Sequence, residues 1–381
     1  MNSRPCLIPV RTMSDSVDVR FMRLALREAR KGLGRTSPNP CVGAVIVKDG
    51  QVIGKGYHHK AGTPHAEINA LGAARQSVRG ATMYVTLEPC NHTGRTPPCT
   101  IAIVESGLAR VVVGLRDPNP LVNGTGMAFL ISRGVEVVSG VLEEECREVN
   151  RFFIKHIGTG QPWVILKAGV SLDGRLNYQR GQSGWITGSQ AVAKAHRLRD
   201  QVDAILVGSG TVKIDNPSLT TRLANGRGRD AIRVVIDSNL STAISSRVYD
   251  LHSQAPTWIF CRESVSAERR MVFESKKIRV IPVSGGSSGV CLKEVVTRLG
   301  QEGVCSLLVE GGARIHGAFL KERLADFAHL LYAPLFAGDG GVPLVESFAA
   351  RDRSSAPRLS GIRLCRLGED FLVSGKLLYP E

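Results

Sequence analysis

The sequence contains no apolar run that approaches the roughly 18 residues of a membrane-spanning helix, so we expect no membrane insertion. The formal net charge is +15, yet Lys and Arg are scattered and form no block of like charges, which argues against a nucleic-acid surface. The nine cysteines show no compact disulfide spacing, and the stretch from Met1 to Pro9 is too short for a secretory signal. We therefore expect a cytoplasmic protein whose dispersed positive charge suits small phosphorylated molecules.

At 381 residues the chain is longer than one hydrophobic core usually supports, so two domains are expected. Its hydrophobic content of 43% and charged content of 22% are ordinary for a globular protein. The run 151–155 ends a first unit, and the glycine-containing stretch 158–162 is predicted to be a linker. We place two domains at residues 17–157 and 162–381 and a disordered extension at residues 1–16, with Met13 as an alternative start.

Three residues of metal-binding type recur between His65 and Cys99 at the spacing of a zinc site. His65, Cys90 and Cys99 supply three ligands, which leaves the fourth position of a tetrahedral zinc ion open for water. Zinc lowers the pKa of a bound water to about 7. Glu67, two residues after the histidine, is placed to carry a proton between that water and a leaving amine. The pattern predicts a zinc-dependent deaminase of nucleobases.

The spacing departs from the usual Pro-Cys-x-x-Cys of those deaminases, because eight residues separate Cys90 from Cys99. The run from Leu87 to Cys99, together with Pro38 to Gly43 and the His-Ala-Glu triplet, closely resembles the deaminase half of the bifunctional riboflavin-biosynthesis deaminase-reductases. The resemblance implies a cytidine-deaminase-like α/β/α sandwich over residues 17–157. It also implies one zinc ion and hydrolytic loss of the 2-amino group of diaminohydroxyphosphoribosylaminopyrimidine.

By the same resemblance, four further residues of this half bind the substrate: Asn39, His58, His92 and Arg95. Read from the residues alone, Asn39 between two prolines is also explained as a turn residue. His92 and Arg95, with Thr96, are also explained as solvated residues of a loop.

The first half alternates helical and β-rich patterns. Asp49-Gly50 lies between two β-rich runs and is a strong hairpin signal. The predicted strands are 42–47, 52–57, 82–87 and 110–115, and the predicted helices are 16–31, 65–77 and 99–106. Alternation of this kind gives an α/β sandwich, with His65, Glu67 and Cys99 on helices.

The second half again alternates strands with helices, which favours a mostly parallel sheet with crossover helices. The predicted strands are 163–169, 204–208, 232–237, 257–261, 278–283 and 306–310, with helices at 189–200 and 313–323. Glycines follow two of these strands, at 208–211 and 311–312, and leave backbone N–H groups that can bind a phosphate. Neither forms the Gly-x-Gly-x-x-Gly fingerprint after a first strand, so a Rossmann domain is disfavoured.

Five segments of this half resemble the reductase half of the same family: 167–175, 183–188, 205–212, 215–222 and 309–312. The resemblance runs from about residue 17 to the end of the chain and implies a dihydrofolate-reductase-like α/β domain over residues 162–381 that uses NADPH. The cofactor is then expected along Gly169, Trp185, Thr211, Asp215, Ser238, Gly312, Ala313, Arg314, Ile315, His316, Gly317 and Ala318. The sugar phosphate is expected at Ser183, Arg199, Leu219 and Arg222, with Glu310 near the reacting ribose.

The resemblance thus implies a bifunctional enzyme, in which the ribosyl chain of 5-amino-6-(5-phosphoribosylamino)uracil is reduced to ribityl after deamination. It also implies a homo-oligomer, either a dimer or a tetramer. Asn216 and Phe327 stand where acidic residues are common in the family, but neither is assigned to chemistry. The preference for NADPH over NADH rests on the resemblance alone, since the sequence shows no clear clamp for a 2′-phosphate.

Three other interpretations are weaker. A transfer-RNA or free-base deaminase would need the shorter Cys-x-x-Cys spacing and would leave the second half unexplained. A non-catalytic zinc module would close the site with a fourth Cys or His ligand, and no residue is obviously placed for that. Loss of activity in one half is disfavoured because every assigned catalytic position is present.

Overall fold

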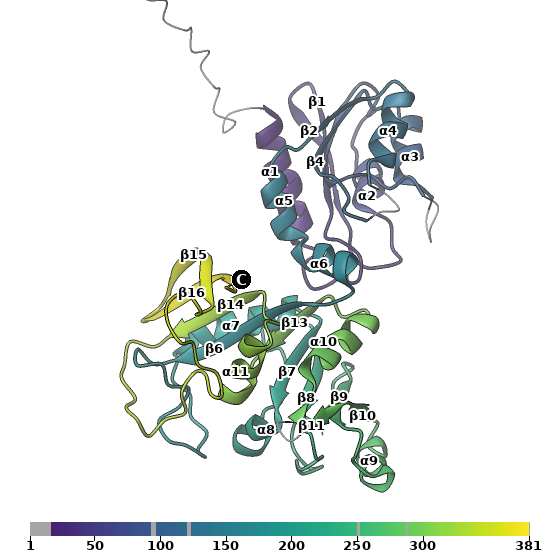
Figure 1. Cartoon of the computed structure of the whole chain (residues 1–381). Coiled ribbons are helices and arrows are strands. Elements are labelled where there is room, and N and C mark those ends of the chain that lie inside the picture. Colours follow the sequence, from purple (N-terminus) through teal and green to yellow (C-terminus); the bar gives the residue numbers. More distant parts are fainter. Residues whose placement is uncertain (1–16, 93–96, 120–122, 250–251, 287–288, 381) are drawn as a thin grey trace, which may run out of the picture. The chain divides into compact units, whose positions relative to one another are not determined.

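The computed structural model describes residues 17–92, 97–119, 123–249, 252–286 and 289–380. They fold into two compact units, one ending at Gly158 and the other beginning at Thr159 (Figure 1). The predicted extension 1–16 lies outside the described residues. Within the described part, no helix is both long and apolar enough to cross a bilayer.

The first unit is a five-stranded mixed sheet between two layers of helices (Figure 1). The strand order is β2-β1-β3-β4-β5, with β1 antiparallel to both of its neighbours and the pairs β3-β4 and β4-β5 parallel. The strands are β1 (Gly43–Lys48), β2 (Gln51–Tyr57), β3 (Thr82–Leu87), β4 (Arg110–Leu115) and β5 (Glu136–Ser139). The helices are α1 (Val17–Arg30), α2 (Ala66–Gly72), α3 (Cys99–Glu105), α4 (Thr125–Ser132), α5 (Glu143–Val149) and α6 (Arg151–Thr159). This arrangement confirms the predicted α/β sandwich.

Alternation along the strands sends apolar side chains to both faces of this sheet. In β1, Ala44 and Ile46 pack with residues of α2 and α3, whereas Val45 and Val47 pack with residues of α1. Helices therefore have to cover both faces to bury this strand. The predicted hairpin between β1 and β2 is confirmed, and it turns at Asp49 and Gly50 with φ angles of 50° and 75°.

A close contact between β2 and α2 fixes the position of that helix. A Cβ atom at Gly56 would lie 2.3 Å from the backbone nitrogen of Ala70, so a side chain does not fit there. The helix ends at Gly72, which corrects the predicted end at Ser77. Arg75 instead donates its backbone N–H to the carbonyl of Ile53 on β2, which holds this segment against the sheet.

The second unit is built on a nine-stranded sheet in the order β10-β9-β8-β7-β13-β6-β14-β16-β15 (Figure 1). Neighbouring strands from β10 to β14 are parallel, and β16 and β15 add an antiparallel edge. The strands are β6 (Trp163–Val170), β7 (Ala204–Gly208), β8 (Ile232–Ile236), β9 (Thr257–Arg262), β10 (Arg279–Val283), β13 (Ser306–Val309), β14 (Phe327–Tyr332), β15 (Arg358–Leu367) and β16 (Asp370–Leu378). The helices are α7 (Ser189–Gln201), α8 (Ser209–Asp215), α9 (Ala267–Glu274), α10 (Leu292–Gln301) and α11 (Ala313–Lys321), and β11 (Gly285–Gly286) pairs with β12 (Gly289–Val290). The predicted mostly parallel sheet is confirmed.

Other parts of the chain also differ from the expectation. The α6 helix continues to Thr159, so the first part of the predicted linker 158–162 is helical. The strands β14, β15 and β16 do not follow from the sequence patterns. Most residues of β15 are exposed. Its sequence accordingly does not show the regular alternation of apolar and polar residues that marks a half-buried strand.

Candidate active sites

A triangle of metal-ligand atoms lies just beyond the end of β3 in the first unit. His65 Nδ1 is 3.5 Å from Cys90 Sγ and 3.3 Å from Cys99 Sγ. The three ligand atoms all lie within 4.8 Å of one another, close enough to share one ion. One imidazole and two thiols are a ligand set typical of zinc, with the fourth tetrahedral position left for water. The structure thus brings together the three residues that the sequence analysis grouped.

Helix starts hold two of these ligands, and Cys90 lies in the segment that follows β3. His65 is the N-cap residue of α2, and its side chain makes no capping hydrogen bond. Cys99 is the first residue of α3, and its backbone N–H donates to Cys90 Sγ at 3.4 Å. The hydrogen bond from the Cys99 thiol, followed by the one from His65, holds the pKa of Cys90 well below its usual range. A thiolate is the form in which cysteine binds a metal.

Glu67 is the buried carboxyl beside this triangle, with 3% of its surface exposed. Burial, and then the neighbouring Cys90 sulfur, raises the pKa of Glu67 to about 7. A carboxyl with a pKa near neutrality can both accept and release a proton. Glu67 lines a cavity of about 420 Å³ together with His65 and Cys90. The cavity therefore brings a substrate to the carboxyl and to two of the three ligand residues, while Cys99 is buried.

Asn39 and His58 form a second polar group on the wall of the same cavity. His58 Nδ1 is 3.2 Å from the carbonyl oxygen of Pro64 and therefore carries the proton, since a carbonyl only accepts. His58 Nε2 then accepts from Asn39 Nδ2 at 3.1 Å. Burial lowers the pKa of His58 and favours this neutral ring. The amide of Asn39 is oriented by this bond, which leaves its oxygen to accept from a ligand.

The remaining substrate residues predicted for this site are only partly described. His92 lines the cavity, and Asn119 and Asp117 line it as well. Arg95 and Thr96 lie outside the described residues.

A buried carboxylate that the sequence patterns did not indicate, Glu88, builds part of this wall. It is 3% exposed and accepts from the backbone N–H groups of Asp117, Gly124, Gly126 and Met127 at 2.9 to 3.2 Å. These bonds hold the segment that carries Asp117 and fix it against the cavity. Burial raises the pKa of Asp117 to about 6. The position of Glu88 next to Pro89-Cys90 was the only signal in the sequence.

In the second unit, a buried ion-paired carboxylate follows β13. Arg199 of α7 donates to both oxygens of Glu310, from Nε to Oε1 at 2.9 Å and from Nη2 to Oε2 at 2.8 Å. Lys167 of β6 places Nζ 3.6 Å from Oε2. Burial opposes ionisation of Glu310, but Arg199 and then Lys167 hold its pKa far below its usual range. The two cations therefore keep a buried carboxylate charged.

The pairing gives Arg199 a different partner from the phosphate expected for it. Its third nitrogen, Nη1, donates to the carbonyl of Thr220 at 3.0 Å. The two guanidinium nitrogens that could bind a phosphate in a bidentate manner, Nε and Nη2, are thus occupied by Glu310. Arg222, in contrast, is exposed, and its Nη1 donates to Thr220 Oγ1 at 3.2 Å. Leu219 is buried with a φ of 54°, so its backbone is the part that a phosphate can meet.

His196 is a further residue at this site that the sequence analysis did not single out. It lies one turn before Arg199 on α7 and is 5% exposed. The backbone N–H of Arg222 donates to His196 Nδ1 at 3.1 Å. That nitrogen must therefore be unprotonated, which places the proton of the neutral ring on Nε2. One turn of α7 thus holds both Glu310 and the segment that carries Arg222.

The predicted cofactor residues lie at the carboxyl ends of neighbouring strands in the second sheet. Gly169 is near the end of β6, Gly312 follows β13, Thr211 follows β7 and Ser238 follows β8, and these strands are consecutive neighbours. A Cβ atom at Gly312 would lie 3.6 Å from Thr211 Oγ1. Gly312 caps α11 without a side-chain hydrogen bond. The start of α11 is therefore open to an anion such as a pyrophosphate.

Other predicted cofactor residues differ in accessibility. Trp185 is 64% exposed, and the Ser183 hydroxyl hydrogen-bonds the carboxylate of Asp215. His316 is buried, and a Cβ atom at Gly317 would lie 1.8 Å from the carbonyl oxygen of Glu346. His316 and Gly317, in the middle of α11, therefore pack inside the unit. Of the predicted residues 312–318, the first ones lie at the start of this helix.

Comparisons with known proteins match both units. Residues 162–373 match the family described as RibD C-terminal domain, and residues 15–115 match the cytidine and deoxycytidylate deaminase zinc-binding region. The riboflavin biosynthesis protein RibD of Aquifex aeolicus is 40% identical over 95% of this chain and 99% of that protein. Its counterpart in Bacillus amyloliquefaciens is 39% identical over 93% of this chain and 95% of that protein. A diaminohydroxyphosphoribosylaminopyrimidine deaminase/5-amino-6-(5-phosphoribosylamino)uracil reductase from Thermotoga maritima has a similar crystal structure, with a TM-score of 0.83 and 37% identity over 95% of this chain and 99% of that one.

Proposed function

Because the chain belongs to the RibD family of riboflavin-biosynthesis proteins, which join a deaminase to a reductase, we propose that its two units act in turn on one phosphorylated pyrimidine. Residues 17–157 deaminate diaminohydroxyphosphoribosylaminopyrimidine. Residues 162–381 then reduce the ribosyl chain of the product, 5-amino-6-(5-phosphoribosylamino)uracil. Both compounds are those named for the Thermotoga maritima relative.

The observation that carries the deaminase proposal is the triangle of His65, Cys90 and Cys99 beside a buried carboxyl. These residues hold one zinc ion, which when bound lowers the pKa of a coordinated water to about 7. Glu67, buried beside the triangle, accepts a proton on the water side and donates it to the departing nitrogen. Asn39, oriented by His58, binds an N–H group of the pyrimidine.

The reductase proposal rests on the ion-paired Glu310 and the open start of α11. NADPH supplies a hydride when bound, and the first backbone N–H groups of α11 hold its pyrophosphate. Arg199 and Lys167 fix Glu310 near the ribose and keep it ionised. Arg222 is exposed and offers its guanidinium to the substrate's phosphate.

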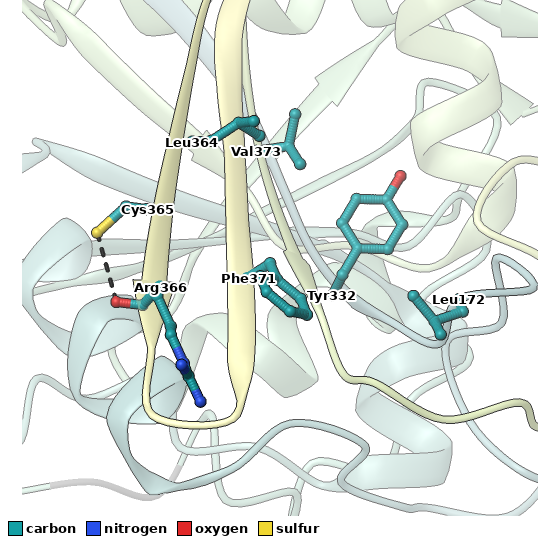
Figure 2. A pocket seen from close by; sticks show the side chains of 7 residues that line it. All are labelled: Leu172, Tyr332, Leu364, Cys365, Arg366, Phe371 and Val373. Carbon is teal, nitrogen blue, oxygen red and sulfur yellow. Dashed lines mark hydrogen bonds between the residues drawn. The ribbon is translucent and has the colours of Figure 1, made fainter.

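We further propose that two or four copies associate, with the β15–β16 hairpin as the contact. β15 is the last strand of its sheet, and Leu364 on it is 76% exposed. Figure 2 shows Leu364, Val373, Phe371 and Tyr332 gathered around one surface hollow. Exposed apolar side chains that gather on an edge strand are normally covered in the native protein. Leu364→Asp should therefore lower the mass measured by light scattering, and a parent protein that is already monomeric would contradict the contact.

The state of the cysteines supports a cytoplasmic location. In the described ranges all eight cysteines are free thiols. A thiolate metal site requires that these sulfurs stay reduced, as they do in the cytosol.

Metal content measured together with ammonia release tests the deaminase proposal. We expect one zinc per chain in the purified parent protein, and ammonia from the diaminopyrimidine ribotide. Cys90→Ser should lose both the metal and the deamination, because two ligands are left to hold the ion. NADPH oxidation by the same variant, given the deaminated substrate, serves as the control for folding of the second unit. Undiminished deamination in verified metal-free protein would contradict the proposal.

A further inference from the structure

Arg262, the last residue of β9, lies at the sheet edge along which the cofactor is proposed to bind. β9 is the parallel neighbour of β8, so Arg262 lies beside the turn that follows β8. Its backbone N–H donates to the carbonyl of Ser238 at 3.1 Å, and its Nε lies 3.5 Å from the same oxygen. Its Nη2 donates to Asn239 Oδ1. The guanidinium is thus held against the turn that contains Ser238.

The order of the strands sets the direction of a bound dinucleotide. A nicotinamide at Gly169 on β6 and a pyrophosphate at Gly312 and Thr211, after β13 and β7, direct the adenosine toward β8. Neighbouring strands are about 4.8 Å apart, so the distance from β6 to β8 is roughly 14 Å. An extended dinucleotide spans a distance of this order. The adenosine ribose is therefore expected near Ser238, after β8, and the next strand in the sheet is β9.

The acidic residue at the end of β8 does not face that ribose. Enzymes that use NAD commonly bind the ribose 2′-hydroxyl with an Asp or Glu after such a strand. Here Asp237 is 1% exposed and accepts from the hydroxyl of Ser241 and from the backbone N–H and hydroxyl of Thr242, at 2.8 to 3.0 Å. The Asp237 carboxylate thus stabilises the turn that follows β8. Ser238 and Arg262 are the residues at the carboxyl ends of β8 and β9 that remain to contact the ribose.

We propose that Arg262 binds the 2′-phosphate of the cofactor and so selects NADPH over NADH. A guanidinium offers a planar set of donors that matches two phosphate oxygens. Two of its present contacts are long, 3.5 Å from Nε to Ser238 and 3.4 Å from Nη1 to the carbonyl of Gly286, so a phosphate can replace them. This inference rests on the proposed use of a nicotinamide cofactor by the second unit.

Equilibrium binding measured by calorimetry tests the inference without any turnover. The parent protein and Arg262→Gln are titrated with NADPH, with NADH, and with 2′,5′-ADP against 5′-AMP. We expect the variant to bind NADPH and 2′,5′-ADP about 10-fold to 100-fold more weakly, the loss typical of one charge-assisted contact, and to bind NADH as the parent does. Unchanged NADH binding also shows that the variant is folded.

Two further variants serve as a charge control and as an intermediate case. Arg269→Gln removes the same charge from α9, where Arg269 donates to the carbonyl of Leu240, and should leave the ratio of NADPH to NADH affinity unchanged. Arg262→Lys keeps the charge without the planar fork and should fall between the parent and Arg262→Gln; it replaces Arg262→Gln if that variant does not fold.

The outcomes separate this inference from the proposed function. Arg262 variants that bind NADPH as tightly as the parent, or that lose NADPH and NADH affinity equally, would overturn the inference while leaving the cofactor proposal in place. A parent protein that binds neither nucleotide would overturn both.

Discussion

Arg199 and Arg222 carry the same charge at the same site but have different partners. Arg199 is 10% exposed on its side chain and paired with Glu310. Arg199→Ala leaves a buried carboxylate without its main partner, so we expect a loss of about 3–5 kcal/mol in the free energy of unfolding. Arg222→Ala should leave stability near that of the parent and raise the reductase KM about tenfold or more, since a charge-assisted contact is worth about 1.5–3 kcal/mol. Urea unfolding and steady-state kinetics measure the two effects, and variants that behaved alike would contradict the division of roles.

We expect His196 to make the stability of the second unit depend on pH. Burial, followed by Arg199 and Arg222, lowers the pKa of His196 from 6.5 to about 4. As the pH falls from about 6.5 toward 4, the unfolded chain takes up this proton before the folded chain does, so stability falls across that window. The protonated ring also loses the lone pair that accepts from Arg222.

His196→Asn should reduce that pH dependence, because an amide oxygen accepts the same N–H without titrating. Free energies of unfolding at about pH 7 and about pH 5 should differ less in the variant than in the parent. Burial also lowers the pKa of His316 to about 4, so His316 should still contribute to the loss of stability at low pH in the variant. Identical differences in the two proteins would show that His196 does not carry this effect.

At the scale of residues, only groups whose type and spacing are specific follow from the sequence. His65, Cys90 and Cys99 follow from ligand chemistry and order, and the structure brings them together, while the role of Glu67 stays a prediction. Glu88 and His196 do not follow from the sequence, because their roles depend on backbone N–H groups that are distant in the sequence, at Asp117 and Arg222. Such pairings appear only when the fold brings the segments together.

At the scale of elements, the glycine at the contact of β2 with α2 sets the place of the first site. A Cβ atom at Gly56 would meet backbone atoms of Ala66, Asn69 and Ala70 at 2.3 to 2.7 Å, so it would push α2 outward. Gly56→Ala should destabilise the first unit by about 1–3 kcal/mol, the usual cost of overpacking. It should also weaken zinc binding, because the ligand His65 moves with the helix.

Gly72→Ala is the matched control in the same helix, since a Cβ atom there meets nothing within 4 Å. Thermal unfolding and zinc content should be close to those of the parent. If Gly56→Ala kept both properties as well, the close approach would not be what holds α2.

Elements with a clear apolar period were predicted well. β3 and β4 have the predicted bounds, because each is a short apolar run between turns. The β15–β16 hairpin was missed because β15 is exposed along most of its length and follows no apolar alternation. β15 is held in the sheet by hydrogen bonds to β16 rather than by burial of apolar side chains. Such pairing leaves no periodic pattern in the sequence.

At the scale of the whole molecule, we predict that the two units carry out their reactions separately. The groups assigned to deamination, such as Glu67 and Cys90, all lie before Gly158, and those assigned to reduction, such as Glu310 and Arg222, all lie after it. Each unit has its own sheet and its own core. A change in one set of groups is therefore expected to leave the other reaction intact.

Glu67→Gln tests this separation most directly. The variant should keep its zinc, because Glu67 is not among the ligands, yet release no ammonia, because an amide cannot carry the proton. Given 5-amino-6-(5-phosphoribosylamino)uracil, the same protein should oxidise NADPH at close to the parent rate. A folded variant that loses both reactions would show that the sites are coupled and would contradict two independent units.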